Sequence, residues 1–308
     1  FSHRVIHNFR KSNYLRYIES IFKCLQEYHS SDSTGAILRS YIHRIEISIN
    51  KRLFDLAKKK IAKAEKLAEE NHAYYYLSII LSLKREIMVS KENLEGMNNY
   101  PHGDYRKAHK CAEIIKNLID YNKLHIQAAR IAKTQLQQIS AKQRMALKML
   151  LENPLLQDEV KALSFPAKQT RYDTLGTIFI LLKDWKKSYL NFKKAVQLME
   201  HNPAYLKSEI EMYMSYISNL VMSMNRLRKD EEITFLYHKV KRFVESLPQK
   251  LQSNRIFQED IKIQNNYINY LLKSFDFHAA LKISEELKAN VKKHGDLQNF
   301  LVFHANFC

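Results

Sequence analysis

The chain has 308 residues, and 45% of them are hydrophobic, while glycine and proline number only five each. This composition supports a substantial buried core and excludes folds rich in sheets and loops, which need more turn residues. The formal net charge of +18 suits nucleic acid, an anionic membrane or acidic proteins as partners without selecting among them, and a solvated lysine-rich surface is the alternative.

Hydropathy and cysteine usage indicate the cellular compartment of the protein. No apolar run approaches the length of a membrane span. The three cysteines, Cys24, Cys111 and Cys308, are far apart and form no C-x-x-C motif, which is typical of a reducing compartment. We therefore expect a cytoplasmic protein without a membrane span.

Apolar residues recur with helical spacing along the chain, and no segment alternates with the period of a strand. Asn153 precedes Pro154 and Asn202 precedes Pro203, which is the arrangement of an N-cap residue followed by proline in the first turn of a helix. We expect an all-α fold with helices over residues 3–29, 34–50, 53–71, 73–94, 104–120, 121–152, 154–163, 167–183, 185–201, 203–227, 230–247, 252–274, 276–294 and from 297 onward.

The segment 172–203 predicts a helical hairpin with a tight corner at residues 183–185. Its first helix places Tyr172, Leu175, Gly176 and Phe179 on one stripe, and its second helix places Ser188, Phe192 and Ala195 on the facing stripe. Gly176, Ser188 and Ala195 lack bulk, so the two backbones can approach closely.

These residues resemble the tetratricopeptide repeat, although Tyr172 stands where that family usually has tryptophan and Ser188 where it has alanine. Weaker copies of the corner lie at 54–57, 103–108 and 275–281. Ser188 and Ala280 are 92 residues apart, so with one hairpin between them each unit spans about 46 residues, more than the family's usual length.

The resemblance implies a right-handed α-α superhelix of lengthened, irregular repeats within one domain over 1–308. That domain comprises N-terminal hairpins over 1–120, a basic helix and connector over 121–165, and C-terminal hairpins over 166–308. Residues 53–71, 152–165 and 172–203 together also resemble a group of bacterial tetratricopeptide-like proteins without an assigned activity, a likeness that implies a fold but no chemistry.

The sequence lacks the usual catalytic motifs: it has no glycine-rich phosphate loop, no G-x-S-x-G and no H-E-x-x-H. The pairs His3 with His7 and His102 with His109 have no nearby ligands to complete a metal site. Asp184 and Asp276 stand at corners and are expected to cap the following helices. We therefore expect no enzymatic activity, no cofactor and no metal.

Two sets of residues are candidate binding surfaces. The first is a basic stripe on the helix predicted over 121–152, whose first 31 residues contain no Asp or Glu; it would bind a polyanion through Lys123, Arg130, Lys133, Arg144 and Lys148. The second is a row on one helical face that would hold a peptide backbone or carboxylate through Lys262, Asn265, Asn269 and Lys273. An ordinary solvated face is the alternative for both.

The leading functional hypothesis is a non-enzymatic scaffold or adaptor that binds a protein or peptide in the concave face of a helical solenoid. The second hypothesis is binding of nucleic acid or another polyanion through the stripe at 121–151. A third is an enzyme or ligand-sensing regulator whose site the sequence does not reveal. The oligomeric state and the identity of the partner stay open.

Overall fold

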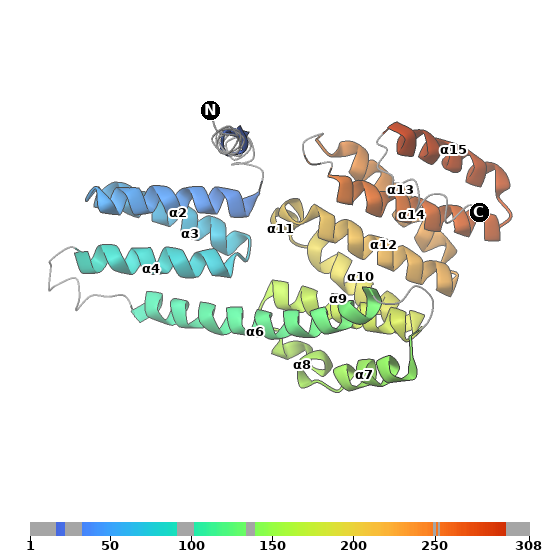
Figure 1. The fold of residues 1–308 in the computed structure, drawn as a ribbon, viewed down its shortest axis with the longest axis horizontal. Coiled ribbons are helices and arrows are strands. Elements are labelled where there is room, and N and C mark those ends of the chain that lie inside the picture. Colours follow the sequence, from blue (N-terminus) through green and yellow to red (C-terminus); the bar gives the residue numbers. More distant parts are fainter. Residues whose placement is uncertain are drawn as a thin grey trace, which may run out of the picture. The chain divides into compact units, whose positions relative to one another are not determined.

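A computed structural model describes residues 17–21, 33–90, 102–133, 139–248, 251 and 253–293. These described residues are helical with connecting turns and contain no strand, which confirms the predicted all-α class (Figure 1). Of the helix predicted over 3–29, residues 17–21 are described and are helical, and the segment from 297 onward lies outside the described residues.

The chain divides into two compact units, Phe1–Ile115 and Lys116–Cys308. The first unit contains α2 (Thr34–Asn50), α3 (Phe54–Glu70), α4 (Tyr74–Ser90) and the beginning of α6 (His102–Lys133). Its buried cluster includes Leu38, Ile45, Ile61 and Ile80, and α6 adds Cys111 to it. The arrangement of 1–308 as one continuous domain stays a prediction.

A network of charged side chains ties the beginning of α6 to α3 and α4 within the first unit. Lys84 Nζ lies 2.9 Å from Asp104 Oδ2 and 3.5 Å from Glu65 Oε2. Lys107 pairs with both Glu65 and Glu69. Because four of these five side chains are about a third or less exposed, the network is shielded from solvent more than a typical surface ion pair.

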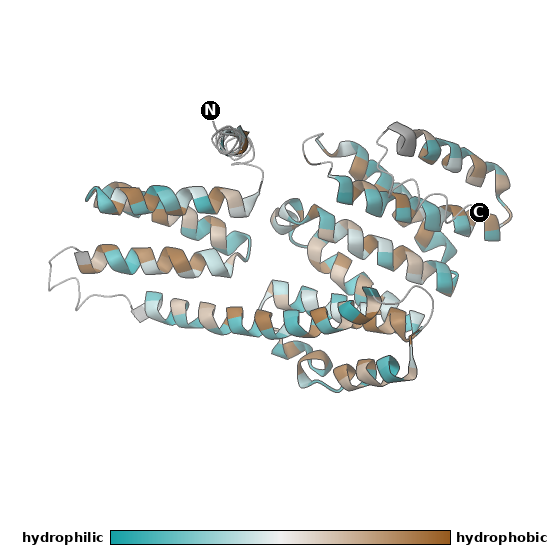
Figure 2. Ribbon diagram, viewed as in Figure 1, coloured by the Kyte–Doolittle hydropathy of each residue, from teal (hydrophilic) through white to brown (hydrophobic). Residues whose placement is uncertain are grey.

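The second unit continues α6 and then contains α7 (Ala141–Leu151), α8 (Pro154–Gln157), the short 3₁₀ helix η1 (Glu159–Lys161), α9 (Phe165–Leu181), α10 (Trp185–Glu200), α11 (Pro203–Ser208), α12 (Ile210–Leu227), α13 (Asp230–Ser246), α14 (Asn254–Lys273) and α15 (Phe277–Lys293). Helix α10 packs against α9 and α12, and α14 packs against α12 and α15. Hydrophobic and hydrophilic residues are interspersed along these helices (Figure 2). In α10, α12, α14 and α15 they segregate to opposite faces, as in amphipathic helices.

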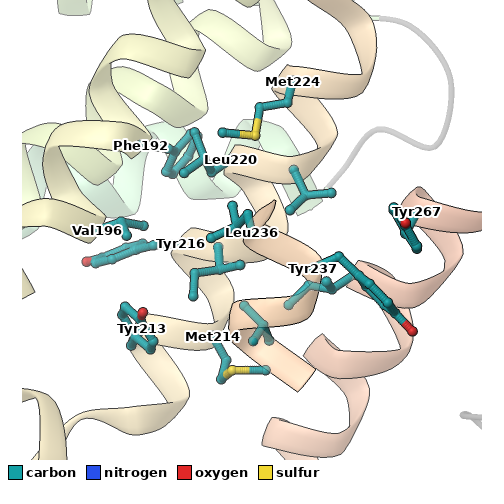
Figure 3. Close-up of a cluster of buried hydrophobic side chains, with 14 of the residues drawn as sticks. Phe192, Val196, Tyr213, Met214, Tyr216, Leu220, Met224, Leu236, Tyr237 and Tyr267 are labelled. Carbon is teal, nitrogen blue, oxygen red and sulfur yellow. The ribbon is translucent and has the colours of Figure 1, made fainter. Parts of the chain in front are cut away.

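The core of these helices is rich in aromatic residues (Figure 3). The rings of Tyr237 on α13 and Tyr267 on α14 stack with centroids 3.9 Å apart. Phe192 on α10 is completely buried and lies 6.4 Å, centroid to centroid, from Tyr216 on α12. Large rigid side chains of this kind account for much of the apolar surface that holds the helices together.

The predicted hairpin over 172–203 forms α9 and α10, and the two helices approach closely where their residues are small. A Cβ atom built on Gly176 would lie 2.6 Å from the ring of Phe192, which excludes any larger residue there without a shift of that ring. Ser188 and Ala195 are fully buried. Ser188 also has a polar partner, because its Oγ lies 2.9 Å from Oγ of Ser223 on α12.

The predicted caps are confirmed. The side chains of Asn153 and Asn202 accept hydrogen bonds from the backbone N–H groups of Leu155 and Tyr205, each in a helix with proline in its first turn. Asp184 accepts from the N–H of Lys187, and Asp276 accepts from the N–H of Ala279 at 3.1 Å. These two aspartates therefore act as helix caps.

Three predicted helix boundaries are wrong. The helix expected to end at 120 continues to Lys133, and a separate helix, α7, begins at Ala141. Ser140 caps α7 together with Gln143 in a reciprocal capping box, which provides the local reason for this new start. The helix expected over 203–227 is interrupted at Glu209, and the one over 154–163 is only the short α8 followed by η1.

Candidate functional site

A polar groove lies between α12 and α14, and it has a volume of about 320 Å³. We call it the α12–α14 groove, and it is lined by Ser215, Ser218, Asn219, Met222, Glu259, Lys262, Asn265, Asn266 and Asn269. Three of the four residues predicted to bind a peptide, Lys262, Asn265 and Asn269, are therefore brought together. The α12 residues that face them were not among the predicted site residues.

Asn265 is the most informative residue of this groove. It is only 5% exposed, and neither its Nδ2 nor its Oδ1 has a hydrogen-bond partner among the described residues. A buried amide without partners costs free energy relative to one that is hydrogen-bonded. Beside the groove, Asn265 therefore holds a buried donor and a buried acceptor that no described residue satisfies.

The charge in the groove is largely compensated. Glu259 is 8% exposed, and Lys262 Nζ donates a hydrogen bond to its Oε1 at 2.8 Å. The rest of the lining consists mainly of neutral amide and hydroxyl groups. Such a surface is suited to neutral polar groups, such as a peptide backbone, more than to an isolated carboxylate.

Lys273, the fourth predicted residue, does not line the groove but lies beside it. Its Nζ donates to Oδ1 of Asn225 at 3.1 Å, and Nδ2 of Asn225 in turn donates to the carbonyl oxygen of Asn266 at 2.9 Å. This chain of hydrogen bonds links α12 to α14. It fixes the backbone of one of the lining residues, so Lys273 contributes to the geometry of the groove.

The α12 residues of the groove can be identified from a backbone conformation that repeats at the corners between helices. The corners after α9, α12 and α14 each have one residue with a positive φ, namely Lys183, Arg228 and Phe275. Measured from these corners, Ser218 on α12 holds the same position as Asn265 on α14, and Asp173 holds it on α9. The corners are 45 and 47 residues apart. Counting back 47 residues from Lys262, Asn265 and Asn269 gives Ser215, Ser218 and Met222, so this spacing was the signal that could have identified them.

The equivalent position on α9 is occupied differently. Asp173 Oδ2 lies 3.7 Å from Nδ1 of His125 on α6. Burial raises the pKa of Asp173, and the nearby His125 and a hydrogen bond from Thr177 oppose that rise. Because Asp173 already has partners, α9 does not repeat the unsatisfied amide that marks the groove.

The five residues of the predicted basic stripe are all exposed, but they are not on one helix. Lys123, Arg130 and Lys133 belong to α6, while Arg144 and Lys148 belong to α7. A stripe on one continuous helix over 121–151 is therefore wrong, because a new helix begins after Ser140.

A second groove, of about 560 Å³, separates these two helices. We call it the α6–α7 groove, and its lining is Asp120, Lys123, Leu124, Gln127, Ile131, Ala146, Met149, Leu150, Asn153 and Leu155.

Histidine, cysteine and acidic residues are the candidates for metal or thiol chemistry. In the described part of the chain, no group of three or more His, Cys, Asp or Glu residues is arranged to hold a metal ion. His3, His7, Cys24 and Cys308 lie outside the described residues, and Cys111 is buried with its pKa raised by that burial. None of the described helices is long and apolar enough to cross a membrane.

The described residues thus form an all-α structure with a polar groove between α12 and α14. Comparisons of the chain with models of protein families, with curated proteins and with solved structures found no match.

Proposed function

We propose that this is a non-enzymatic binding protein that holds an extended segment of a partner protein or peptide in the α12–α14 groove. The observation that carries the proposal is the buried amide of Asn265, whose donor and acceptor both lack partners among the described residues. A peptide backbone offers the complementary acceptor and donor.

The proposal includes a tetratricopeptide-like right-handed superhelix as the scaffold. Its support is the repetition of one corner geometry. Arg228 follows Lys183 by 45 residues, Phe275 follows Arg228 by 47, and all three adopt a positive φ. Stacked hairpins of this kind present the equivalent faces of successive helices side by side, which makes a preorganised binding surface.

The size and charge of the groove restrict the ligand. A volume of about 320 Å³ is at the lower end for ligand sites, which suits a short segment and not a folded domain. Because Lys262 is already paired with Glu259, we expect the selected segments to be polar and uncharged where they contact Asn265 and Asn269. Affinity then depends on hydrogen bonds made inside a desolvated groove.

Selection from a random peptide library on the full chain, followed by binding measurements with the selected peptides, tests this function. The variant Asn265→Leu keeps a similar side-chain volume and removes both amide groups, so we expect it to weaken binding at least about tenfold, the effect of roughly 1.4 kcal/mol. Asn191→Leu, on α10 outside the groove, is the matched control.

The stability of the two variants separates a lost site from a lost fold. Asn265→Leu removes an unsatisfied buried amide, so its free energy of unfolding in urea should equal or exceed that of the parent protein. Undiminished binding of the selected peptides to a folded Asn265→Leu variant would contradict the assignment of the groove.

The second candidate function is binding of a polyanion by Lys123, Arg130, Lys133, Arg144 and Lys148. The observation that favours it is the exposure of all five side chains, together with the absence of any Asp or Glu in residues 121–151. If the triple change of Arg130, Lys133 and Arg144 to Gln leaves retention on a nucleic-acid column and its salt dependence unaltered, nucleic acid is not the ligand.

A further inference from the structure

The lining of the α12–α14 groove contains two charged residues, Glu259 and Lys262, and they differ in burial. The side chain of Glu259 is 10% exposed, whereas that of Lys262 is 48% exposed. Nζ of Lys262 lies 2.8 Å from Oε1 of Glu259. The negative charge is therefore held in the wall of the groove, while its positive partner is half in solvent.

Lys262 is the counter-ion of Glu259. Among the described residues, no other cation lies within 4 Å of the carboxylate oxygens of Glu259. Arg255, one turn earlier on α14, pairs with Glu211 on α12 at 3.9 Å. Loss of the partner of a buried carboxylate is costly. A ligand group that displaces Lys262 must therefore bring a positive charge of its own.

The difference in burial gives the groove a preference for one sign of charge. Lys262 has a long, flexible and half-exposed side chain, so water can solvate its ammonium group once a ligand cation replaces it. An anionic ligand has no such exchange available. To reach the wall it would have to move Lys262 away and then lie against the unpaired Glu259, and like charges repel strongly in a shielded site.

We infer that Glu259 determines the charge specificity of the α12–α14 groove by selecting segments with an ammonium or guanidinium group, which replaces Lys262. This inference rests on the proposed function of the same groove and adds a charged position to its ligand. Glu259 precedes Asn265 by six residues, about 9 Å along the helix axis, which is the reach of roughly two to three residues of extended peptide.

The ligand cation therefore lies about two or three residues from the backbone groups that bond to Asn265. Two sources offer the same chemistry, a lysine or arginine side chain within the segment and the free N-terminus of a peptide. Either one can donate charge-assisted hydrogen bonds to the carboxylate of Glu259.

A random library of N-acetylated, C-amidated peptides of about eight residues, long enough to span the groove, tests the charge preference on the full chain. We expect lysine and arginine to be enriched among the bound peptides, and aspartate and glutamate to be depleted. The tightest binder is then synthesised in three forms. The first carries lysine at the selected cationic position, the second carries norleucine there, and the third carries norleucine and a free N-terminus.

Fluorescence anisotropy compares these peptides on the parent protein and its variants. The norleucine form should bind the parent about tenfold less tightly than the lysine form, whereas the two forms should bind Glu259→Gln within a factor of about two. Lys262→Met removes the competing cation and should bind the lysine form at least about threefold more tightly than the parent does. Glu285→Gln, at an exposed site on α15, is the matched control and should keep the parent's preference.

Several results would overturn the inference. Enrichment of acidic residues in the library, or equal binding of the lysine and norleucine forms to the parent, contradicts a cation site. A preference that persists in folded Glu259→Gln assigns the cation to another acid. If Glu259→Gln does not fold, unchanged affinity of Lys262→Met for the lysine form is the contradicting result. Recovery of affinity by the free N-terminus supports the inference and identifies the terminus as a second source.

Failure of this inference is separable from failure of the proposed function. Asn265→Leu should weaken the lysine and norleucine forms by the same factor, because it acts on the backbone contacts and not on the charge. Peptides that depend on Asn265 but show no charge preference contradict the role of Glu259 alone. A library without binders, or binders indifferent to Asn265→Leu, contradicts the peptide groove itself and with it the inference.

Discussion

Asp260 lies beside a small polar cavity of about 140 Å³ between α13, α14 and α15. Two further acids, Glu245 and Glu286, and one cation, Lys241, also line that cavity. Burial raises the pKa of Asp260 to about 6, although Nε2 of Gln264 donates a hydrogen bond to its carboxyl oxygen at 2.7 Å and Lys241 is nearby. Helix α14 therefore contains two groups that cost folding stability, the desolvated carboxyl group of Asp260 and the unsatisfied amide of Asn265.

The raised pKa predicts how Asp260 affects stability with pH. Because the folded pKa of about 6 exceeds the unfolded value near 3.9, the folded state binds more protons between them, and stability falls as pH rises through this window. Asp260→Asn should therefore raise the free energy of unfolding by roughly 1 to 3 kcal/mol at pH 8 and by about zero at pH 4.

Urea denaturation followed by circular dichroism at both pH values measures this difference. The exposed Glu285→Gln on α15 controls for the loss of one negative charge. An equal effect of Asp260→Asn at pH 4 and pH 8 would show that the carboxyl group is not desolvated in the folded protein.

At the scale of elements, the corners of the hairpins have the same backbone geometry. The backbone N–H of Asp184 donates to the carbonyl oxygen of Phe179 at 2.9 Å, and Asp276 donates in the same way to Leu271 at 2.9 Å. The residue before each aspartate, Lys183 or Phe275, has a positive φ. This is the Schellman ending of a helix, made here with side chains where glycine is usual, which explains how so few glycines suffice.

A glycine at such a corner should stabilise the protein. Lys183 has φ of 62°, a left-handed conformation that costs a residue with a Cβ atom about 1 to 2 kcal/mol. Part of that gain is lost to the entropy of glycine in the unfolded chain, so Lys183→Gly should raise the free energy of unfolding by roughly 0.5 to 1 kcal/mol.

The matched control is the same substitution inside a helix. Lys282→Gly on α15 should lower stability by about 1 kcal/mol, because glycine there costs helix propensity. If both substitutions destabilise the protein in thermal or urea unfolding, the left-handed corner at Lys183 is not strained.

The elements also show why α6 and α7 were predicted as one helix. Both carry helical apolar spacing, and neither Gly nor Pro occurs between Lys133 and Ala141, so the usual punctuation is absent. The usable signal was Ser140 followed three residues later by Gln143, which forms the capping box. That signal is weaker than a proline and is easily outweighed by periodicity.

At the scale of the whole molecule, each of the two compact units has a hydrophobic cluster of its own. Ile80 on α4 is fully buried in the first unit, and Ile217 on α12 is fully buried in the second. Truncation of such a residue to alanine costs about 2 to 5 kcal/mol. The two substitutions therefore test whether the chain unfolds as one cooperative domain.

We expect Ile80→Ala to reduce hydrogen-exchange protection in α2, α3 and α4 while leaving α12 and α14 protected, and Ile217→Ala to do the reverse. Mass spectrometry of exchanged peptic fragments gives both readouts in one experiment. Equal loss of protection throughout the chain in either variant would indicate a single cooperative domain over 1–308.

Much of the architecture follows from local patterns. Helical periodicity determines the all-α class, and capping chemistry determines the helix starts at Asn153, Asn202, Asp184 and Asp276. The small residues of the hairpin over 172–203 determine the close approach of Gly176 to Phe192. These features depend on residues near one another in sequence, which is why they could be predicted.

Only the tertiary structure decided which polar residues are buried and which of them are left without partners, because the helices that cover them are distant in sequence. Lys262 is neutralised by Glu259, Lys273 bonds to Asn225, and Asn265 is left without a partner among the described residues. Helical spacing placed Lys262, Asn265 and Asn269 on one face, but the groove forms only because α12 packs beside them, and Ser218, the α12 residue equivalent to Asn265, lies 47 residues earlier in the chain. The groove is therefore a property of packing, and its residues alone could only suggest it.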